Sequence, residues 1–268
     1  MLRMIIAVAL ALCATPAGAE TIRIGGTGAA LGTMRLQADA FHATGTQSRV
    51  SVLQALGSGG AIKALFAGGV EIAVLSRPPT TEERERGLTV TEYAVTPLVF
   101  ATWRGNPIDG VTVADLADLY AGRRTQWRDR TPVRLVLRPS SDSDTQVMSG
   151  MSHDLRDGVA AAGKRQGMIV ANNDTEAADL IERTEGSIGS TTLALLLSER
   201  RNVKVLVLDG VVPSTKALAD GRYRLQKHLY LVTATGAGAG TRGFVAFVRS
   251  PAGRVILERT GHLPTAAR

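Results

Sequence analysis

The residues best suited to chemistry in this chain are the serines and glycines at 57–60 and the serine that ends the apolar run at 71–76. Ser58 and Gly59 stand just before the helical pattern of residues 61–67, and Ser76 directly follows a short strand pattern. A helix N-terminus leaves backbone amides unpaired, and glycine lets a ligand approach the backbone closely. Amides and hydroxyls together suit a small anion. The sequence therefore predicts an anion cradle at Ser58, Gly59 and Ser76.

Ser58 and the glycine loop at 25–28 each allow a second interpretation. Ser58 is also a suitable N-cap, in which case its hydroxyl would bind the helix and not a ligand. The glycine loop at 25–28 resembles a dinucleotide-binding turn, but its spacing does not give GxGxxG and no acid ends the next strand pattern. Dinucleotide binding by that loop is therefore disfavoured. The loop is then either a simple glycine turn or a contact for an anion.

Enzyme chemistry finds little support in the residues. The four histidines, His42, His153, His228 and His262, are widely separated and form no metal-binding spacing. A GxSxG nucleophile motif is also missing, and two nearby aspartates at 142 and 144 are too few for a metal site. The sequence therefore predicts a binding protein without a cofactor.

The first 19 residues have the pattern of a secretory signal peptide. A basic start is followed by an apolar stretch and by the small-residue cleavage site Ala17-Gly18-Ala19. Removing 19 of the 268 residues leaves 249, and it also removes Cys13, the single cysteine. We therefore expect a periplasmic protein that has neither a disulfide nor a reactive thiol.

The net charge of +7 indicates an acidic or anionic partner, and loss of Arg3 with the signal leaves +6. No long basic run and no alternation of basic with aromatic residues follows, so nucleic acid is disfavoured and a small anion is favoured. Beyond the signal, no apolar stretch is long enough to span a membrane.

Strand-like and helix-like runs alternate along the chain, which is typical of an α/β fold. Two long apolar strand patterns, at 95–103 and 229–235, divide the sequence into three blocks. The simplest architecture has two lobes joined by two crossover segments. Residues 20–102 with 229–268 would form the first lobe, and 103–228 the second.

Several segments then carry a resemblance in their order and spacing: 25–31, 57–63, 74–78, 116–122 with 127–129, and 209–213, 221–225 and 229–233. Together they resemble the periplasmic phosphate-binding proteins of the type II solute-binding fold. Those proteins capture substrate for ABC phosphate importers. The resemblance implies two lobes, each a mixed sheet flanked by helices, with two crossover strands as the hinge. It also implies a monomer that works with a permease and ATPase complex in the inner membrane.

The resemblance assigns the ligand contacts to four loops. The Ala30 and Leu31 amides would act as donors in the first of them. The implied ligand-binding residues are Gly28, Ala30, Leu31, Ser58, Gly59, Ser76, Arg77, Arg138, Ser143, Asp144 and Thr145.

Two positions depart from the family pattern. The fourth family loop reads Gly-Ser-Gly-Thr, whereas aspartates stand here on either side of Ser143. A carboxylate beside an oxyanion raises the free energy unless it takes up a proton or is neutralised. The second departure is Arg77, where some branches carry an acid. Arg77 would bind the anion or pair with Asp142 or Asp144 when the lobes close.

The departures leave three alternatives open. The ligand would be phosphate, another oxyanion or a small carboxylate. The occupied protein would serve an importer, or it would signal to a membrane-bound sensor kinase. Arg138 would either bind the anion or be an ordinary surface arginine of a basic protein.

Overall fold

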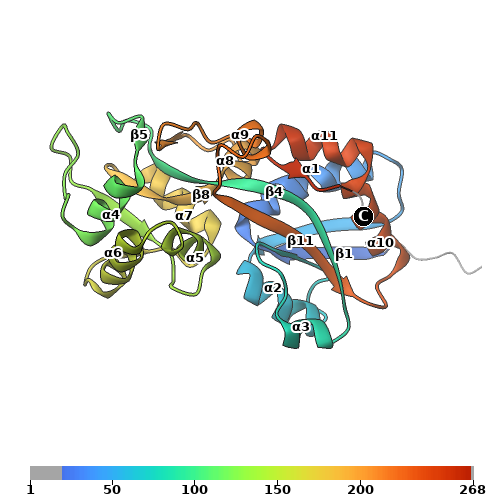
Figure 1. Cartoon of the computed structure of the whole chain (residues 1–268). Helices are drawn as coiled ribbons and strands as arrows, with labels where there is room; N and C mark the ends of the chain where they lie inside the picture. The colour runs from blue at the N-terminus through green and yellow to red at the C-terminus, as the bar shows by residue number, and fades with distance from the viewer. Residues whose placement is uncertain (1–19, 267–268) are drawn as a thin grey trace, which may run out of the picture.

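The chain folds into two lobes joined by long strands (Figure 1). The computed structural model describes residues 20–266, so the predicted signal peptide and Cys13 lie outside the described residues. One lobe holds the helices α1 to α3, α10 and α11, and the other holds α4 to α7. No helix within residues 20–266 combines the length and the apolarity needed to cross a bilayer.

The strands, in chain order, are β1 (Thr21–Gly26), β2 (Arg49–Ala55), β3 (Ile72–Leu75), β4 (Leu88–Trp103), β5 (Gly110–Val111), β6 (Arg134–Leu137), β7 (Ile169–Val170), β8 (Ser187–Thr192), β9 (Val203–Val205), β10 (Val207–Leu208), β11 (Gln226–Ala234) and β12 (Leu263–Pro264). The helices are α1 (Gly28–His42), α2 (Gly57–Phe66), α3 (Thr81–Glu85), α4 (Val113–Ala121), α5 (Ser143–Ser149), α6 (His153–Lys164), α7 (Asp174–Arg183), α8 (Leu193–Ser198), α9 (Thr215–Ala219), α10 (Ala239–Arg249) and α11 (Pro251–Arg259).

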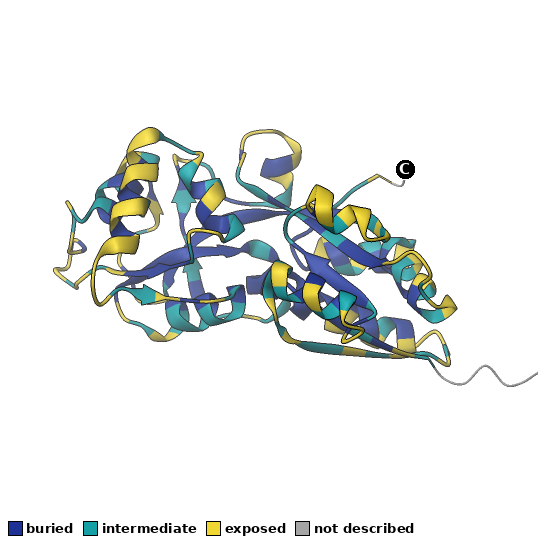
Figure 2. Cartoon of the chain, turned by 90° about the horizontal axis from the view of Figure 1, so that it is seen from below, coloured by how far each residue is buried: buried dark blue, intermediate teal, exposed yellow. Residues whose placement is uncertain are grey.

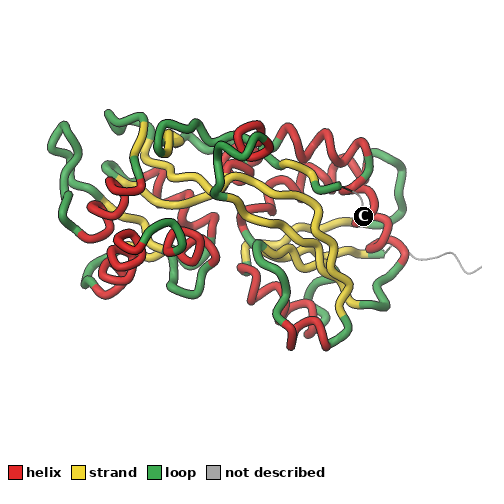
Figure 3. The backbone as a smooth tube through the Cα atoms, viewed as in Figure 1, coloured by secondary structure: helices red, strands yellow, loops and turns green. Residues whose placement is uncertain are grey.

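A single mixed sheet runs through both lobes in the order β2-β1-β3-β11-β4-β8-β6-β7 (Figure 3). The pairs of β1 with β2 and β3, and of β6 with β7 and β8, are parallel. Both β11 and β8 run antiparallel to β4. The predicted α/β fold with two lobes is confirmed, and the parallel strands of each lobe carry their carboxyl ends toward the junction.

The strand β4 changes partner at Pro97. Its first part pairs with β11 as far as Pro97 opposite Gln226, and from Leu98 onward it pairs with β8, beginning opposite Thr192. Proline has no N–H to donate to a ladder, so it fits the position where pairing with one neighbour ends. One continuous strand thereby belongs to both lobes.

Each lobe has its own apolar core, seen as dark strands beneath exposed helix faces (Figure 2). In the first lobe Phe41 and Phe244 meet edge to face, with ring centroids 5.4 Å apart. In the second lobe Trp127 is buried and its Nε1 donates to the Gly186 carbonyl at 2.9 Å. Trp127 therefore serves the packing of the second lobe.

The helices α1 and α2 begin earlier than the sequence pattern predicts, at Gly28 and Gly57 instead of 33 and 61. Glycine has low helix propensity, so glycine-rich first turns do not show as helix in a sequence. As a result Ser58 lies inside the first turn of α2. The N-cap of α2 is Leu56 with no side-chain bond, so the N-cap alternative for Ser58 is wrong.

Candidate anion-binding site

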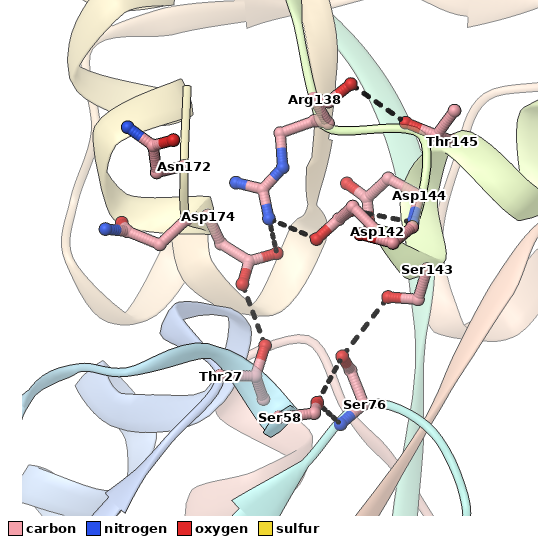
Figure 4. A network of polar contacts seen from close by, with 12 residues as sticks. Thr27, Ser58, Ser76, Arg138, Asp142, Ser143, Asp144, Thr145, Asn172 and Asp174 are labelled. Carbon is pink, nitrogen blue, oxygen red and sulfur yellow. Dashed lines mark hydrogen bonds and ion pairs between the residues drawn. The ribbon is translucent and has the colours of Figure 1, made fainter. Parts of the chain in front are cut away.

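Three serines from different segments meet at the junction of the lobes (Figure 4). Ser58 Oγ lies 3.2 Å from Ser76 Oγ and accepts the Ser76 backbone N–H at 3.0 Å. Ser76 Oγ lies 3.2 Å from Ser143 Oγ of the second lobe. The predicted cradle of Ser58 and Ser76 is therefore brought together, and a hydroxyl of the opposite lobe completes it.

The parallel strands explain why these residues meet. Thr27, Ser58 and Ser76 follow the carboxyl ends of β1, β2 and β3, and Arg138 follows the carboxyl end of β6. The carboxyl ends of parallel strands share one edge of a sheet, and ligands bind there in open α/β folds. The two lobes turn these edges toward each other, which brings the polar residues of both together at the junction.

Arg138 is buried at this junction, with 4% of its side chain exposed. Its Nη2 donates to Asp142 Oδ2 at 2.5 Å and lies 3.9 Å from Asp174 Oδ1. Within residues 20–266 its Nε and Nη1 have no hydrogen-bond partner. A buried guanidinium with two free donors suits an oxyanion. The alternative of an ordinary surface arginine is wrong.

A buried lysine on β11, Lys227, pairs with the carboxylates of Asp144 and Asp174. The side chain of Lys227 is 1% exposed, and its Nζ pairs with Asp144 Oδ1 and lies 3.1 Å from Asp174 Oδ1. Thr27 Oγ1 donates to Asp174 Oδ2 at 2.8 Å. Because Thr27 follows β1 and Asp174 begins α7, this bond also joins the two lobes.

The buried groups shift one another's pKa. Burial raises the pKa of Asp144, and the neighbouring carboxylates add to the rise against the opposing effect of Lys227. Burial would also raise the pKa of Asp174, but Lys227, Arg138 and the Thr27 hydroxyl lower it below its ordinary value. Burial would lower the pKa of Lys227, whereas Asp144 and Asp174 raise it. Asp174 and Lys227 therefore stay ionised, and Asp144 is the group nearest to titration.

The remaining predicted residues of the first loop lie at the start of α1. Ala30 and Leu31 are buried, and the Ala30 amide donates to the Thr27 carbonyl at 3.2 Å. Gly28 faces the second lobe so closely that a Cβ there would lie 2.7 Å from Thr175 Oγ1 and 2.9 Å from Thr175 N. Glycine at 28 thus permits the approach of the lobes.

The predicted residues of the other loops are placed as follows. Gly59 lies in the first turn of α2, is exposed, and a Cβ added there would meet no atom within 4 Å. Thr145 Oγ1 donates to the Arg138 carbonyl at 3.3 Å, which ties α5 to the end of β6. The Asp144 amide is occupied by Asp142 Oδ1 at 2.9 Å, so this position of the fourth loop offers no free amide.

Arg77 is turned to a different partner from the one expected. Its guanidinium forms two 2.8 Å bonds with Glu83 of α3. The expected pairing with Asp142 or Asp144 is absent, because those two carboxylates pair with Arg138 and Lys227. Arg77 therefore braces the loop that follows Ser76.

Sequence reasoning missed Thr27, Asp174 and Lys227. Thr27 lies within the glycine loop at 25–28, and Asp174 shows in the sequence only the pattern of a helix start. Lys227 gave a signal of its own, because it is a lone lysine two residues before the apolar run of a central strand that begins at Leu229. Lysine is almost never fully buried unless it is paired.

Fold and site together define a two-lobed solute-binding protein whose polar residues gather at the junction of the lobes. The chain belongs to the family described as the PBP superfamily domain, whose model matches residues 14–252. The family is one of solute-binding transport proteins, so the chain is not an enzyme.

Three known proteins illustrate the similarity. The phosphate-binding protein PstS of Borreliella burgdorferi is 26% identical, over 78% of this chain and 77% of that protein. Protein SphX of Synechococcus elongatus is 25% identical, over 79% of this chain and 68% of that protein. A solved substrate-binding protein ascribed to a phosphate ABC transporter of Clostridium perfringens, with bound phosphate, has a TM-score of 0.77 and 19% identity, covering 92% of this chain and all of that one.

Proposed function

We propose that this protein captures phosphate or a similar small oxyanion between its lobes and delivers it to an ABC importer. The observation that carries the proposal is the meeting of Ser58, Ser76 and Ser143 from both lobes, close to a buried arginine with free donors. Relatives named for phosphate binding support the choice of ligand.

The three serine hydroxyls can exchange their bonds to one another for bonds to a ligand. In the structure they bond to one another at 3.2 Å, so each can turn its hydrogen toward an oxyanion without leaving a buried group unpaired. Arg138 would direct its free Nε and Nη1 to the ligand while Asp142 and Asp174 hold the Nη2 side of the guanidinium. Charge-assisted bonds of this kind are stronger than neutral ones.

The lobes would open and close by bending in β4 and β11. The sequence pattern puts the lobe boundaries at 102/103 and 228/229, whereas β4 changes its pairing partner at Pro97. The bonds from Thr27 to Asp174 and from Ser76 to Ser143, which join side chains of opposite lobes, must break on opening. Hinge closure around a ligand is a common device of two-lobed binding proteins. The protein would work in the periplasm as a monomer, with a membrane permease and its ATPase as partners.

Thermal unfolding with added inorganic phosphate tests the proposal. A ligand at 100 times its dissociation constant stabilises the fold by about 2.7 kcal/mol, and we expect a matching rise in melting temperature. Arg138→Gln should abolish the rise, whereas the matched variant Arg128→Gln, at an exposed arginine, should retain it. No rise with millimolar phosphate for the unchanged protein would refute phosphate capture.

A further inference from the structure

The buried charges at the lobe junction do not balance. Two cations, Arg138 and Lys227, face three carboxylates, Asp142, Asp144 and Asp174. Asp142 is 19% exposed at its side chain, and the other four are exposed by 4% or less. When all five are ionised, the cluster carries one net negative charge. An oxyanion entering beside Ser143 would add more negative charge at the same place.

Like charges in a region of low dielectric repel strongly, and a titratable group relieves the repulsion by taking up a proton. Asp174 is not that group, because it has Lys227, Arg138 and the Thr27 hydroxyl as partners. Asp142 accepts from Arg138 and from the Asp144 amide and is the most exposed of the three.

Asp144 is the remaining candidate. Its side chain is 1% exposed, and Lys227, the one cation within ion-pair distance of it among residues 20–266, is shared with Asp174. Charged and titratable groups face Asp144 from each element packed around this carboxylate. They are Asp142 before α5, Arg138 after β6, Asp174 of α7, Lys227 of β11 and Tyr120 of α4. Burial raises the pKa of Tyr120, so this phenol stays neutral and supplies no charge.

We propose that the site takes up one proton together with its oxyanion, and that Asp144, positioned by Lys227, is the residue that requires this proton. The inference rests on the proposed oxyanion capture. The phosphate dianion carries a charge of −2 and the ionised cluster a charge of −1, so the complex would carry −3. One proton taken up from solvent lowers this charge to −2. The proton is shared by Asp144 and the nearest ligand oxygen and counts as one in any macroscopic titration.

Calorimetric titration with inorganic phosphate at about pH 8, in two buffers of different ionisation enthalpy, counts the protons directly. The unchanged protein should take up close to one proton per phosphate. Asp144→Asn keeps the size of the side chain and removes the titrating group, so its uptake should fall to near zero. The matched variant Asp154→Asn, at an exposed aspartate of α6, should behave as the unchanged protein does.

A second measurement needs no variant. In the same pH range the phosphate affinity of the unchanged protein should fall about tenfold per pH unit, as one linked proton requires. Phosphate binding without proton uptake would overturn this inference and leave the proposed function standing. Equal uptake by Asp144→Asn and the unchanged protein would also overturn it. Failure of phosphate to bind at all would refute both.

Discussion

Lys227 Nζ lies 3.1 Å from Asp174 Oδ1, and both side chains are 3% exposed or less. The lysine belongs to β11, which pairs with β3 and β4 of the first lobe, and the aspartate begins α7 of the second. This ion pair therefore joins β11, a strand of the central sheet, to the start of α7 in the second lobe. Loss of the lysine leaves both Asp174 and Asp144 buried without their shared cation.

We expect Lys227→Met to lower the free energy of unfolding by about 3–5 kcal/mol, because breaking a buried pair from one side leaves uncompensated charge. Denaturant unfolding measures this change. Lys216→Met is the matched control, since Lys216 is exposed and its pair with Asp220 is worth less than about 1 kcal/mol. Equal losses for the two variants would contradict the prediction.

Stability should decrease on acidification through His262. Burial lowers the pKa of His262 from its ordinary value to about 4. The folded state thus prefers the neutral ring, so this contribution is complete above about pH 6.5 and is lost as pH falls from 6.5 toward 4, a change of about 3 kcal/mol. Unfolding measured against pH should show this loss, and His262→Leu should remove it. Parallel pH curves for the two proteins would disprove the assignment.

Ser143→Ala should weaken phosphate binding by roughly tenfold to a hundredfold, which corresponds to the loss of about 1.5–3 kcal/mol for one hydrogen bond to a charged group. Calorimetric titration gives the affinity. Ser51→Ala, at an exposed position of β2, provides the control and should bind normally. An unchanged affinity for Ser143→Ala would exclude this hydroxyl from the site.

Gly28→Ala should weaken phosphate binding by hindering closure, because the added Cβ would lie 2.7 Å from Thr175 Oγ1 across the junction. The affinity should drop by about fivefold to 150-fold, as expected when roughly 1–3 kcal/mol of overpacking opposes the closed state. Small-angle scattering with saturating phosphate should show a more open molecule. Gly163→Ala, where the added methyl group meets open space, should close and bind normally. Full closure of Gly28→Ala would contradict the prediction, because it would show that Thr175 can move away from the added Cβ.

Much of the site was predictable because short sequence patterns indicate where its residues lie in the fold. The anion loops at Ser58 and Ser76 follow short strand patterns, and such residues meet at the carboxyl edge of any parallel sheet. The alternation of strands and helices likewise predicts the two-lobed fold. The starts of α1 and α2 were misplaced because glycine weakens the helical signal of a first turn.

Local sequence patterns suffice to predict the class of fold, the position of the serine loops and the basic character that favours an anion. Which charges face one another depends on how the chain folds in space. Asp142 pairs with Arg138 four residues away, but Asp144 pairs with Lys227 across 83 positions, and Arg77 turns to Glu83. Charges compete for partners according to distance and burial in space, and sequence spacing does not contain these quantities. The partners of Asp144, on which proton uptake depends, therefore became visible only in the folded chain.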